Sequence, residues 1–302
     1  MLGESQMSGE KISDVVVHRT SPRIDPSKKP VKERFDLSSD LRIDRLPKGL
    51  ADKIFEACEP PGFRFNPVRQ FGQLYSFIRD TPPNTNDLQW DTDQRLQRCL
   101  ALSRIVHPTS ISFEFAARIF ASEDGEISKI VPGPVSGSGA QAFVVDPKFN
   151  YLTDADASDL KELIQAFERK PLQDPIARAM WYHEYAARSC EIDVRWTFIA
   201  TGIEVLIHKN RHKSTKQFVE RVKRLSVEVG ADLVTEDEAE KMYELRSALS
   251  HGQGLSGLTP LKMQLYQKME NILRLTIRKS IVDQAFDDFL SDPDNIRRRW
   301  PV

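Results

Sequence analysis

The stretch DVRWTFIATGIEVLIHK, Asp193–Lys209, decides the fold that we predict for this chain. Its apolar side chains would lie nearly all the way round a helix of about 3.6 residues per turn, rather than along one stripe. Such a helix offers no broad face to water, so neighbouring helices have to cover it on most sides. We therefore expect this segment at the centre of a helical bundle.

Segments on both sides of it predict the surrounding helices. Apolar residues repeat at helical spacing, with capping residues at the ends, in LTDADASDLKELIQAFERK, DPIARAMWYHEYAARSC, STKQFVERVKRLSVEVG and TEDEAEKMYELRSALSHG. A last long helix is expected from about Pro260 to Leu290, and short loops join these elements. The pattern predicts a mainly α fold, with a helical bundle over 151–290 and a short C-terminal tail over 291–302.

The first half of the chain has a different character. Residues 1–47 are rich in Ser, Pro, Lys and Asp and hold few large apolar side chains, which predicts a disordered tail. Residues 48–150 combine two short helices, in LPKGLADKIFEACEP and DTDQRLQRCLALSRIVHP, with a hairpin of SISFEFAARIF and ISKIV. AQAFVVD is a further candidate strand. We expect a small α+β region here, whose role the sequence does not indicate.

Composition narrows the class of protein. A content of 40% hydrophobic and 29% charged residues is typical of globular domains, and 302 residues favour two of them. There is no run of about 18 apolar residues for a membrane span, and no secretory signal. Three scattered cysteines, Cys58, Cys99 and Cys190, fit a reducing cytoplasm and lack zinc-site spacing. We expect a cytoplasmic protein without metal or cofactor, whose net charge of -1 leaves nucleic-acid binding to local patches.

The stretch RSALSHG, Arg246–Gly252, is the strongest candidate for chemistry. An arginine followed at this spacing by a histidine is a weak signal alone, because RAMWYH, Arg178–His183, repeats it. Five residues turn about 140° round a helix, so the two side chains share no face in mid-helix. Gly252 marks a helix end, however, where the backbone can turn His251 back toward Arg246. The alternative is structural, with His251 on the helix dipole and Arg246 on a carboxylate.

A longer stretch of similarity gives this motif a context. The ordered set RAMWYHEYAARSCEIDVRWTFIATGIEVLI, STKQFVERVKRLSVEVG and YELRSALSHGQ resembles the HEPN superfamily, most closely its ApeA-like branch, over about residues 151–290. The shared features are an apolar helix carrying Glu204, a basic helix with Phe218 and Arg221, and a Tyr-x-x-Arg-Ser helix that ends in His-Gly. The resemblance does not extend to residues 48–150.

The resemblance implies a function. Many HEPN proteins are metal-independent endoribonucleases of toxin, antiphage and RNA-processing systems, with an Arg–His motif that Arg246 and His251 match. Ser247 stands where the family often has Asn. Some members are catalytically silent, so a non-catalytic protein- or nucleotide-binding module is the alternative. RNA is the expected partner of an active enzyme, and the first half of the chain would bind a regulatory partner or sense a trigger.

The resemblance also implies an assembly. HEPN proteins usually form homodimers in which two motifs meet in one cleft. The apolar helices DVRWTFIATGIEVLIHK and PLKMQLYQKMENILRLTI are candidate surfaces for this contact, although the core of a monomer explains their apolar character equally well.

The predicted chemistry suits these residue types. RNA is cleaved without metal when its own 2′-hydroxyl attacks the adjacent phosphate, which leaves a cyclic phosphate end. The step needs a group that moves protons near neutral pH, as imidazole does, so His251 is the candidate general acid or base. It also needs a fixed positive charge beside the phosphorane, which the guanidinium of Arg246 would supply.

Two further groups of residues complete the predicted site. Glu204 lies among apolar residues, where an unpaired carboxylate is costly, so a salt bridge with Arg246 is expected. A basic run with one acid, Glu220, would hold RNA phosphates unless it is simply a solvated helix face. Its members are Lys209, Arg211, Lys213, Lys216, Arg221, Lys223 and Arg224.

Overall fold

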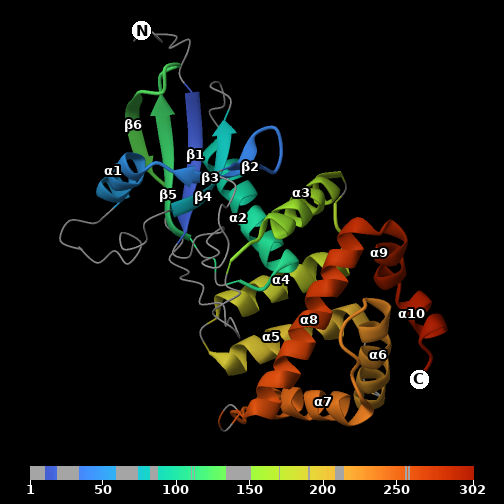
Figure 1. Ribbon diagram of the computed structural model, residues 1–302. Coiled ribbons are helices and arrows are strands. Elements are labelled where there is room, and N and C mark those ends of the chain that lie inside the picture. Colours follow the sequence, from blue (N-terminus) through green and yellow to red (C-terminus); the bar gives the residue numbers. More distant parts are fainter. Residues whose placement is uncertain are drawn as a thin grey trace, which may run out of the picture. The chain divides into compact units, whose positions relative to one another are not determined.

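The computed structural model describes most of the chain (Figure 1). The described residues are 11–18, 34–58, 74–81, 88–109, 111, 113–133, 151–169, 171–189, 191–207, 214–255, 257 and 259–302. They form ten helices and six strands in which helix predominates, so the mainly α class is confirmed. No helix among them is long and apolar enough to cross a membrane.

The chain divides into two compact units, Met1–Ile164 and Gln165–Val302. The division falls inside helix α3, Asp154–Arg169, and not after residue 150 as the sequence pattern suggested. Thr153 caps this helix, because its hydroxyl accepts a hydrogen bond from the amide of Asp156 at 3.1 Å. The first part of α3 therefore belongs to the first unit, so the start of the helical pattern does not mark the domain boundary.

The first unit contains an antiparallel sheet whose described strands follow the order β2-β3-β4-β1-β5-β6 (Figure 1). The strands are β1 Lys11–His18, β2 Arg34–Asp36, β3 Leu41–Leu46, β4 Leu74–Thr81, β5 Phe113–Ala121 and β6 Ile127–Pro132. Two helices, α1 Lys48–Cys58 and α2 Leu88–Val106, belong to the same unit. The two predicted helices and the β5–β6 hairpin are confirmed, whereas the candidate strand AQAFVVD lies outside the described residues.

The prediction of a disordered tail over residues 1–47 is wrong for residues 11–18 and 34–46. β1 is an inner strand that pairs with β4 on one side and β5 on the other, while β2 and β3 pair with each other. Val15 of β1 is 2% exposed and lies between Ile78 of β4 and Ala117 of β5. The average composition of the segment hides apolar residues such as Val15, which is buried because distant strands flank it.

Both faces of the sheet contribute to the core. Ile54 and Phe55 of α1 pack with Val15 and Ile78 on one face. The neighbouring residue of β4, Phe77, is fully buried and points to the opposite face, since side chains alternate along a strand. α2 packs against β4 and buries Leu96, Leu100 and Ile105. The sheet is thus an inner layer of the first unit.

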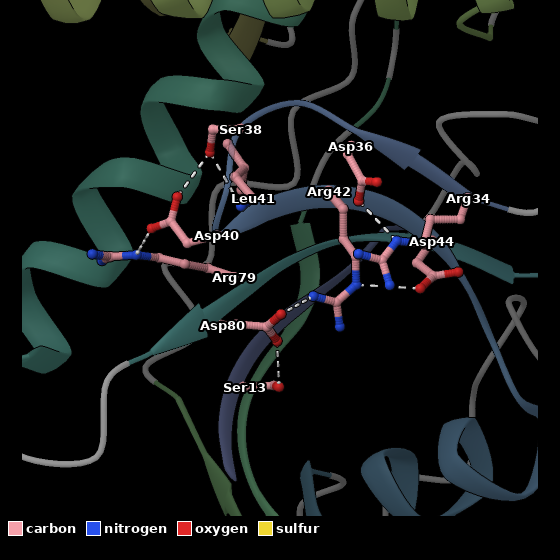
Figure 2. A network of polar contacts seen from close by, with 10 residues as sticks. All are labelled: Ser13, Arg34, Asp36, Ser38, Asp40, Leu41, Arg42, Asp44, Arg79 and Asp80. Carbon is pink, nitrogen blue, oxygen red and sulfur yellow. Dashed lines mark hydrogen bonds and ion pairs between the residues drawn. The ribbon is translucent and has the colours of Figure 1, made fainter.

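Cross-strand ion pairs connect β3, β4 and β1 (Figure 2). Arg42 of β3 lies between Asp44 on its own strand, at 3.2 Å, and Asp80 of β4. Asp80 also accepts a hydrogen bond of 2.9 Å from the hydroxyl of Ser13 on β1. These contacts link three neighbouring strands on one face of the sheet, where opposite charges stabilise cross-strand pairing.

A second ion-pair centre, at Asp40, joins the sheet to α2, and Figure 2 shows its contacts with Arg79 and Ser38. Asp40, which precedes β3, accepts hydrogen bonds from Arg79 of β4 at 3.3 Å and from Arg95 of α2. Burial alone would raise the pKa of Asp40, but Ser38, Arg95 and Arg79 together lower it. The carboxylate of Asp40 therefore stays ionised, and it links Arg79 of β4 to Arg95 of α2.

The second unit consists of helices. Their bounds are α4 Asp174–Arg188, α5 Ile192–Ile207, α6 Ser214–Glu228, α7 Glu236–Ser250, α8 Pro260–Val282, α9 Gln284–Ser291 and α10 Pro293–Arg299. α5 packs against α4, α6, α7 and α8. Its residues Trp196, Ile199, Ile203 and Leu206 are at most 1% exposed. The helix that is apolar nearly all round is thus the central one, as its sequence predicted.

The end of the chain differs from the prediction in two respects. The helix expected over 260–290 is interrupted at Asp283, whose carboxylate accepts a hydrogen bond of 3.1 Å from the amide of Phe286 and so starts α9. Asp292 does the same for Asp294 at 2.8 Å, and Pro293 opens α10. The predicted tail over 291–302 therefore contains a helix. Aspartate caps end and restart the helices even though the apolar spacing continues.

The inner position of β1 can be tested by hydrogen exchange. We expect slow amide exchange over residues 11–18, and we expect Val15→Ala to accelerate exchange in β1, β4 and β5 together. The substitution removes two buried methyl groups, which should lower the free energy of unfolding of the first unit by about 2 kcal/mol. Lys11→Ala on the same strand is the control, since Lys11 is exposed. Fast exchange of residues 11–18 in the unaltered protein would contradict this topology.

The contact between α5 and α8 holds a partly buried carboxyl, that of Glu270. Burial raises the pKa of Glu270 on α8 to about 7, although the charges of Arg195 on α5 and Arg274 on α8 act in the opposite direction. Arg195 is 2% exposed and donates a hydrogen bond of 2.6 Å to the carbonyl of Ser189. The contact between α5 and α8 therefore contains a carboxyl that titrates near neutral pH.

Glu270 predicts a pH dependence of stability. The folded protein holds this proton up to a pH of about 7, whereas the unfolded chain releases it near the usual 4.5. Between these values the folded state binds more protons, so the contribution of Glu270 to stability falls as the pH rises. Urea unfolding measures the free energy of unfolding of wild type and of Glu270→Gln. The difference between these two free energies should change by on the order of 2 kcal/mol between pH 5 and 8. Parallel pH profiles of the two proteins would exclude a shifted Glu270.

Candidate functional site

The end of α7 has the geometry that its glycine predicts. Gly252 adopts a φ of 76°, in the left-handed region. Its amide bonds to the carbonyl of Leu249, and the amide of Gln253 bonds to that of Ala248, each at 3.0 Å. This hydrogen-bond pattern is a Schellman motif, and it makes His251 the C-cap residue of the helix. The backbone of His251, with φ of -95° and ψ of 13°, has left regular helical geometry.

The predicted salt bridge between Glu204 and Arg246 is present. A guanidinium nitrogen of Arg246 on α7 lies 2.8 Å from a carboxylate oxygen of Glu204 on α5. The side chain of Glu204 is 12% exposed and that of Arg246 is 27% exposed. The ion pair compensates the cost of burying the charge of Glu204 on the central helix. It also fixes the guanidinium of Arg246, which still reaches the surface.

A second contact holds the chain that follows α7. The amide of Leu255 donates a hydrogen bond of 3.3 Å to the carboxylate of Asp193, near the N-terminal end of α5. Glu204 lies near the opposite end of the same helix, so the residues between Arg246 and Leu255 run along the side of α5. We call Glu204, Arg246, Ser247 and His251 the α5–α7 site.

His251 and Ser247 are accessible in this arrangement. His251 is exposed, and its imidazole makes no polar contact with the described residues. Ser247 is partly exposed, and its carbonyl accepts a 3.2 Å hydrogen bond from the amide of His251. The α5–α7 site therefore offers a fixed guanidinium and an accessible imidazole about one and a half helical turns apart in sequence.

The described members of the predicted basic run lie in different surroundings. Lys209, Arg211 and Lys213 lie outside the described residues, and Lys216 is exposed on the first turn of α6. Lys223 is paired with two acids, Glu236 at 3.2 Å and Glu220 at 3.6 Å. Arg224 is partly exposed and donates a weak hydrogen bond of 3.4 Å to the carbonyl of Arg299.

Arg221 cannot serve as the RNA-binding residue that the sequence suggested. It is 3% exposed and donates a hydrogen bond of 2.8 Å to the carbonyl of Ile207, the last residue of α5. A guanidinium on the carbonyl end of a helix satisfies an unpaired acceptor and interacts favourably with the helix dipole. The role of Arg221 is to cap the central helix, which a count of charges along the sequence does not distinguish from phosphate binding.

Two surface features were not singled out from the sequence. The first is the run Arg297–Arg299 on α10, which lay in the predicted tail; three consecutive arginines are the signal that could have drawn attention to it. The second is aromatic. Trp181 and Tyr185 on α4 are 50% and 43% exposed, with ring centroids 4.1 Å apart, and Tyr185 contacts Phe198 of α5 at 5.6 Å.

The two apolar helices that the sequence offered as candidate dimer surfaces mainly build the core of the second unit. α5 and α8 bury most of their apolar side chains inside the second unit, including Ile199 and Ile272. The helices that the sequence favoured mainly build the core, while α4 carries the exposed rings.

Comparison with family models, with curated proteins and with solved structures finds no match to this chain. Among the described residues, no three His, Cys, Asp or Glu side chains are grouped so that they could hold a metal ion. What the α5–α7 site can do thus follows from its own residues.

The coupling of the ion pair can be measured by a double-mutant cycle. Arg246→Met leaves the carboxylate of Glu204 mostly buried without its cation, which should cost about 2 kcal/mol of stability. Adding Glu204→Gln should recover part of this loss, with a coupling energy of about 1 kcal/mol between the two positions. His251→Ala should change stability by less than about 0.5 kcal/mol, because the imidazole is exposed. Strictly additive losses for the two ion-pair positions would show that they do not interact.

Proposed function

We propose that this chain is a HEPN-like, metal-independent endoribonuclease in which Arg246 and His251 act on the RNA phosphate. The observation that carries the proposal is the α5–α7 site itself. Glu204 on α5 holds the guanidinium of Arg246 on α7 at 2.8 Å. The helix that carries Arg246 ends in an exposed histidine, His251, without a polar partner among the described residues. An exposed imidazole that no neighbouring group of the described chain engages is available for the proton transfers that RNA cleavage requires.

In this proposal the 2′-oxygen of a ribose attacks the adjacent phosphorus, and the bond from phosphorus to the 5′-oxygen of the next nucleotide breaks. The products are a 2′,3′-cyclic phosphate and a free 5′-hydroxyl. Arg246 faces the phosphorane oxygens, where its planar donors match the geometry and the charge. His251 accepts the proton of the 2′-hydroxyl or delivers one to the 5′-oxygen.

Two proton transfers require two groups, and each chain supplies one His251 to the α5–α7 site. A homodimer in which two such sites share a cleft would provide the second imidazole. The exposed rings of Trp181 and Tyr185 on α4 offer apolar surface for this association. An enzyme of this kind would serve in antiphage defence or as a toxin, with the first unit binding a regulatory partner.

Cleavage of RNA in the presence of EDTA tests the proposal. The wild type should cut, and His251→Ala should reduce the rate by roughly 10²–10⁴-fold. Arg246→Lys retains a cation for Glu204, so it should fold normally, yet it should cut about 10²-fold more slowly because an ammonium lacks the planar pair of donors. Arg178→Ala, which removes the exposed arginine of the other Arg–His string, is the matched control and should leave the rate unchanged. Equal rates for all four proteins would remove Arg246 and His251 from the mechanism.

The alternative is a non-catalytic HEPN-like module that binds a protein or a nucleotide. The exposed aromatic side chains on α4 favour it, since large exposed rings are typical of interaction surfaces. It predicts that no RNA is cut by the wild type in any state of association, and that substitutions of Arg246 alter only the melting temperature.

A further inference from the structure

Arginines gather where α6 meets α10. Arg221 and Arg224 are one turn apart on α6, and Arg224 donates to the carbonyl of Arg299 on α10 at 3.4 Å. Burial, and then the charges of Arg297 and Arg224, lower the pKa of Arg221. The charges of Arg224 and Arg297 thus both act on the buried guanidinium of Arg221.

Two carboxylates near these arginines are already paired, one of them with Arg297 itself. Glu228 accepts from Arg299 at 2.8 Å and lies 3.4 Å from Lys279, while Asp294 pairs with Arg297 at 2.7 Å. Within the described ranges, neither Arg224 nor Arg298 pairs with a carboxylate, and both side chains reach the surface. We call Arg224, Arg297 and Arg298 the α6–α10 basic surface.

α10 is held firmly enough to present these charges. Ile296 is fully buried and Trp300 is 4% exposed, with its ring 5.1 Å from that of Phe289 in an edge-on contact. The guanidinium of Arg299 lies over the ring of Phe289 at 4.9 Å. The packing of α10 thus brings Arg299 against α6, where it pairs with Glu228.

The basic surface begins at the same end of α5 as the α5–α7 site. Arg221 bonds to Ile207, the last residue of α5, and Arg246 bonds to Glu204, about 4.5 Å earlier along the helix axis. The rings of Phe218 on α6 and Tyr243 on α7, 5.5 Å apart, connect the two helices that carry these arginines. The helices that carry Arg221 and Arg246 are therefore packed together at this end of α5.

We propose that the α6–α10 basic surface binds the phosphate backbone of the RNA strand that the α5–α7 site cleaves. This inference rests on the proposed function and adds α10 to the substrate-binding surface. A row of phosphates relieves the repulsion among clustered cations, and its counterions are released on binding. Guanidinium groups also pair with phosphate through two donors, which suits Arg224 and Arg298 because no carboxylate of the described chain occupies them.

Fluorescence anisotropy of a labelled single-stranded oligoribonucleotide tests this surface. The full-length protein carries His251→Ala so that the RNA stays intact. In that background, Arg224→Ala/Arg298→Ala should weaken binding roughly tenfold at low salt and reduce the slope of log K against log salt by about 2. Arg178→Ala/Lys241→Ala, which removes the same charge from exposed positions on α4 and α7, is the matched control. Arg224→Lys/Arg298→Lys should retain most of the affinity.

The outcomes separate this inference from the ribonuclease activity. Equal affinities of the double alanine variant and its control at every salt concentration would overturn the inference, even if the wild type cleaves RNA. No detectable RNA binding in the His251→Ala background would overturn it as well and would assign the surface to an acidic protein instead. Charge-dependent RNA binding without cleavage by the wild type would support the surface and refute the proposed catalysis.

Discussion

The ion pair between Glu204 and Arg246 is the interaction on which the α5–α7 site depends. α5 is buried on most of its circumference, and a carboxylate on such a helix requires a cation close by. Arg246 meets this need and ties α7 to the central helix. The bond between Leu255 and Asp193 ties the following residues to the other end of α5. His251 lies between these two contacts, so its position on the surface follows from the way α5 is packed.

This arrangement gives Arg246 two roles that experiments must separate. Loss of its guanidinium removes a proposed phosphate contact and also removes the cation that pairs with the mostly buried carboxylate of Glu204. A loss of activity after Arg246→Ala would therefore not identify a catalytic residue by itself. His251 has no such ambiguity, because its exposed side chain has no polar contact within the described residues.

The end of α5 also explains how a chain of nearly neutral charge can offer a local cationic surface. Arg221 is buried on the last carbonyl of that helix and fixes α6 beside it. Arg224 on the next turn of α6, together with α10, then places further guanidinium groups at the surface. Cations that cap a helix and cations that remain free for a ligand thus come from the same helix, and only burial distinguishes them.

The sequence predicted the features that local rules govern. The apolar side chains all round Asp193–Lys209 predicted that this helix is the central one. Gly252 marked the end of α7, and the cost of an unpaired Glu204 indicated its salt bridge with Arg246. It missed β1, because the partners of Val15 lie on strands more than 60 residues away in sequence.

Competition between local signals explains the other differences. Asp283 interrupts the last long helix although the apolar spacing continues, since its carboxylate caps α9. Arg221 resembles its basic neighbours in sequence, and only the position of the α5 carbonyls shows that it is buried. The HEPN relationship is a prediction from the ordered motifs over about residues 151–290, and the dimer and the ribonuclease activity are what that resemblance implies.

The most direct test of the central claim is the chemistry of the cut RNA end. The account predicts that, in EDTA, the protein leaves 2′,3′-cyclic phosphate ends detectable by mass spectrometry, and that a 2′-deoxy substitution at the cleaved position blocks the cut. Products with 3′-hydroxyl ends, or unimpaired cleavage at the 2′-deoxy position, would contradict a mechanism in which Arg246 and His251 assist attack by the 2′-hydroxyl.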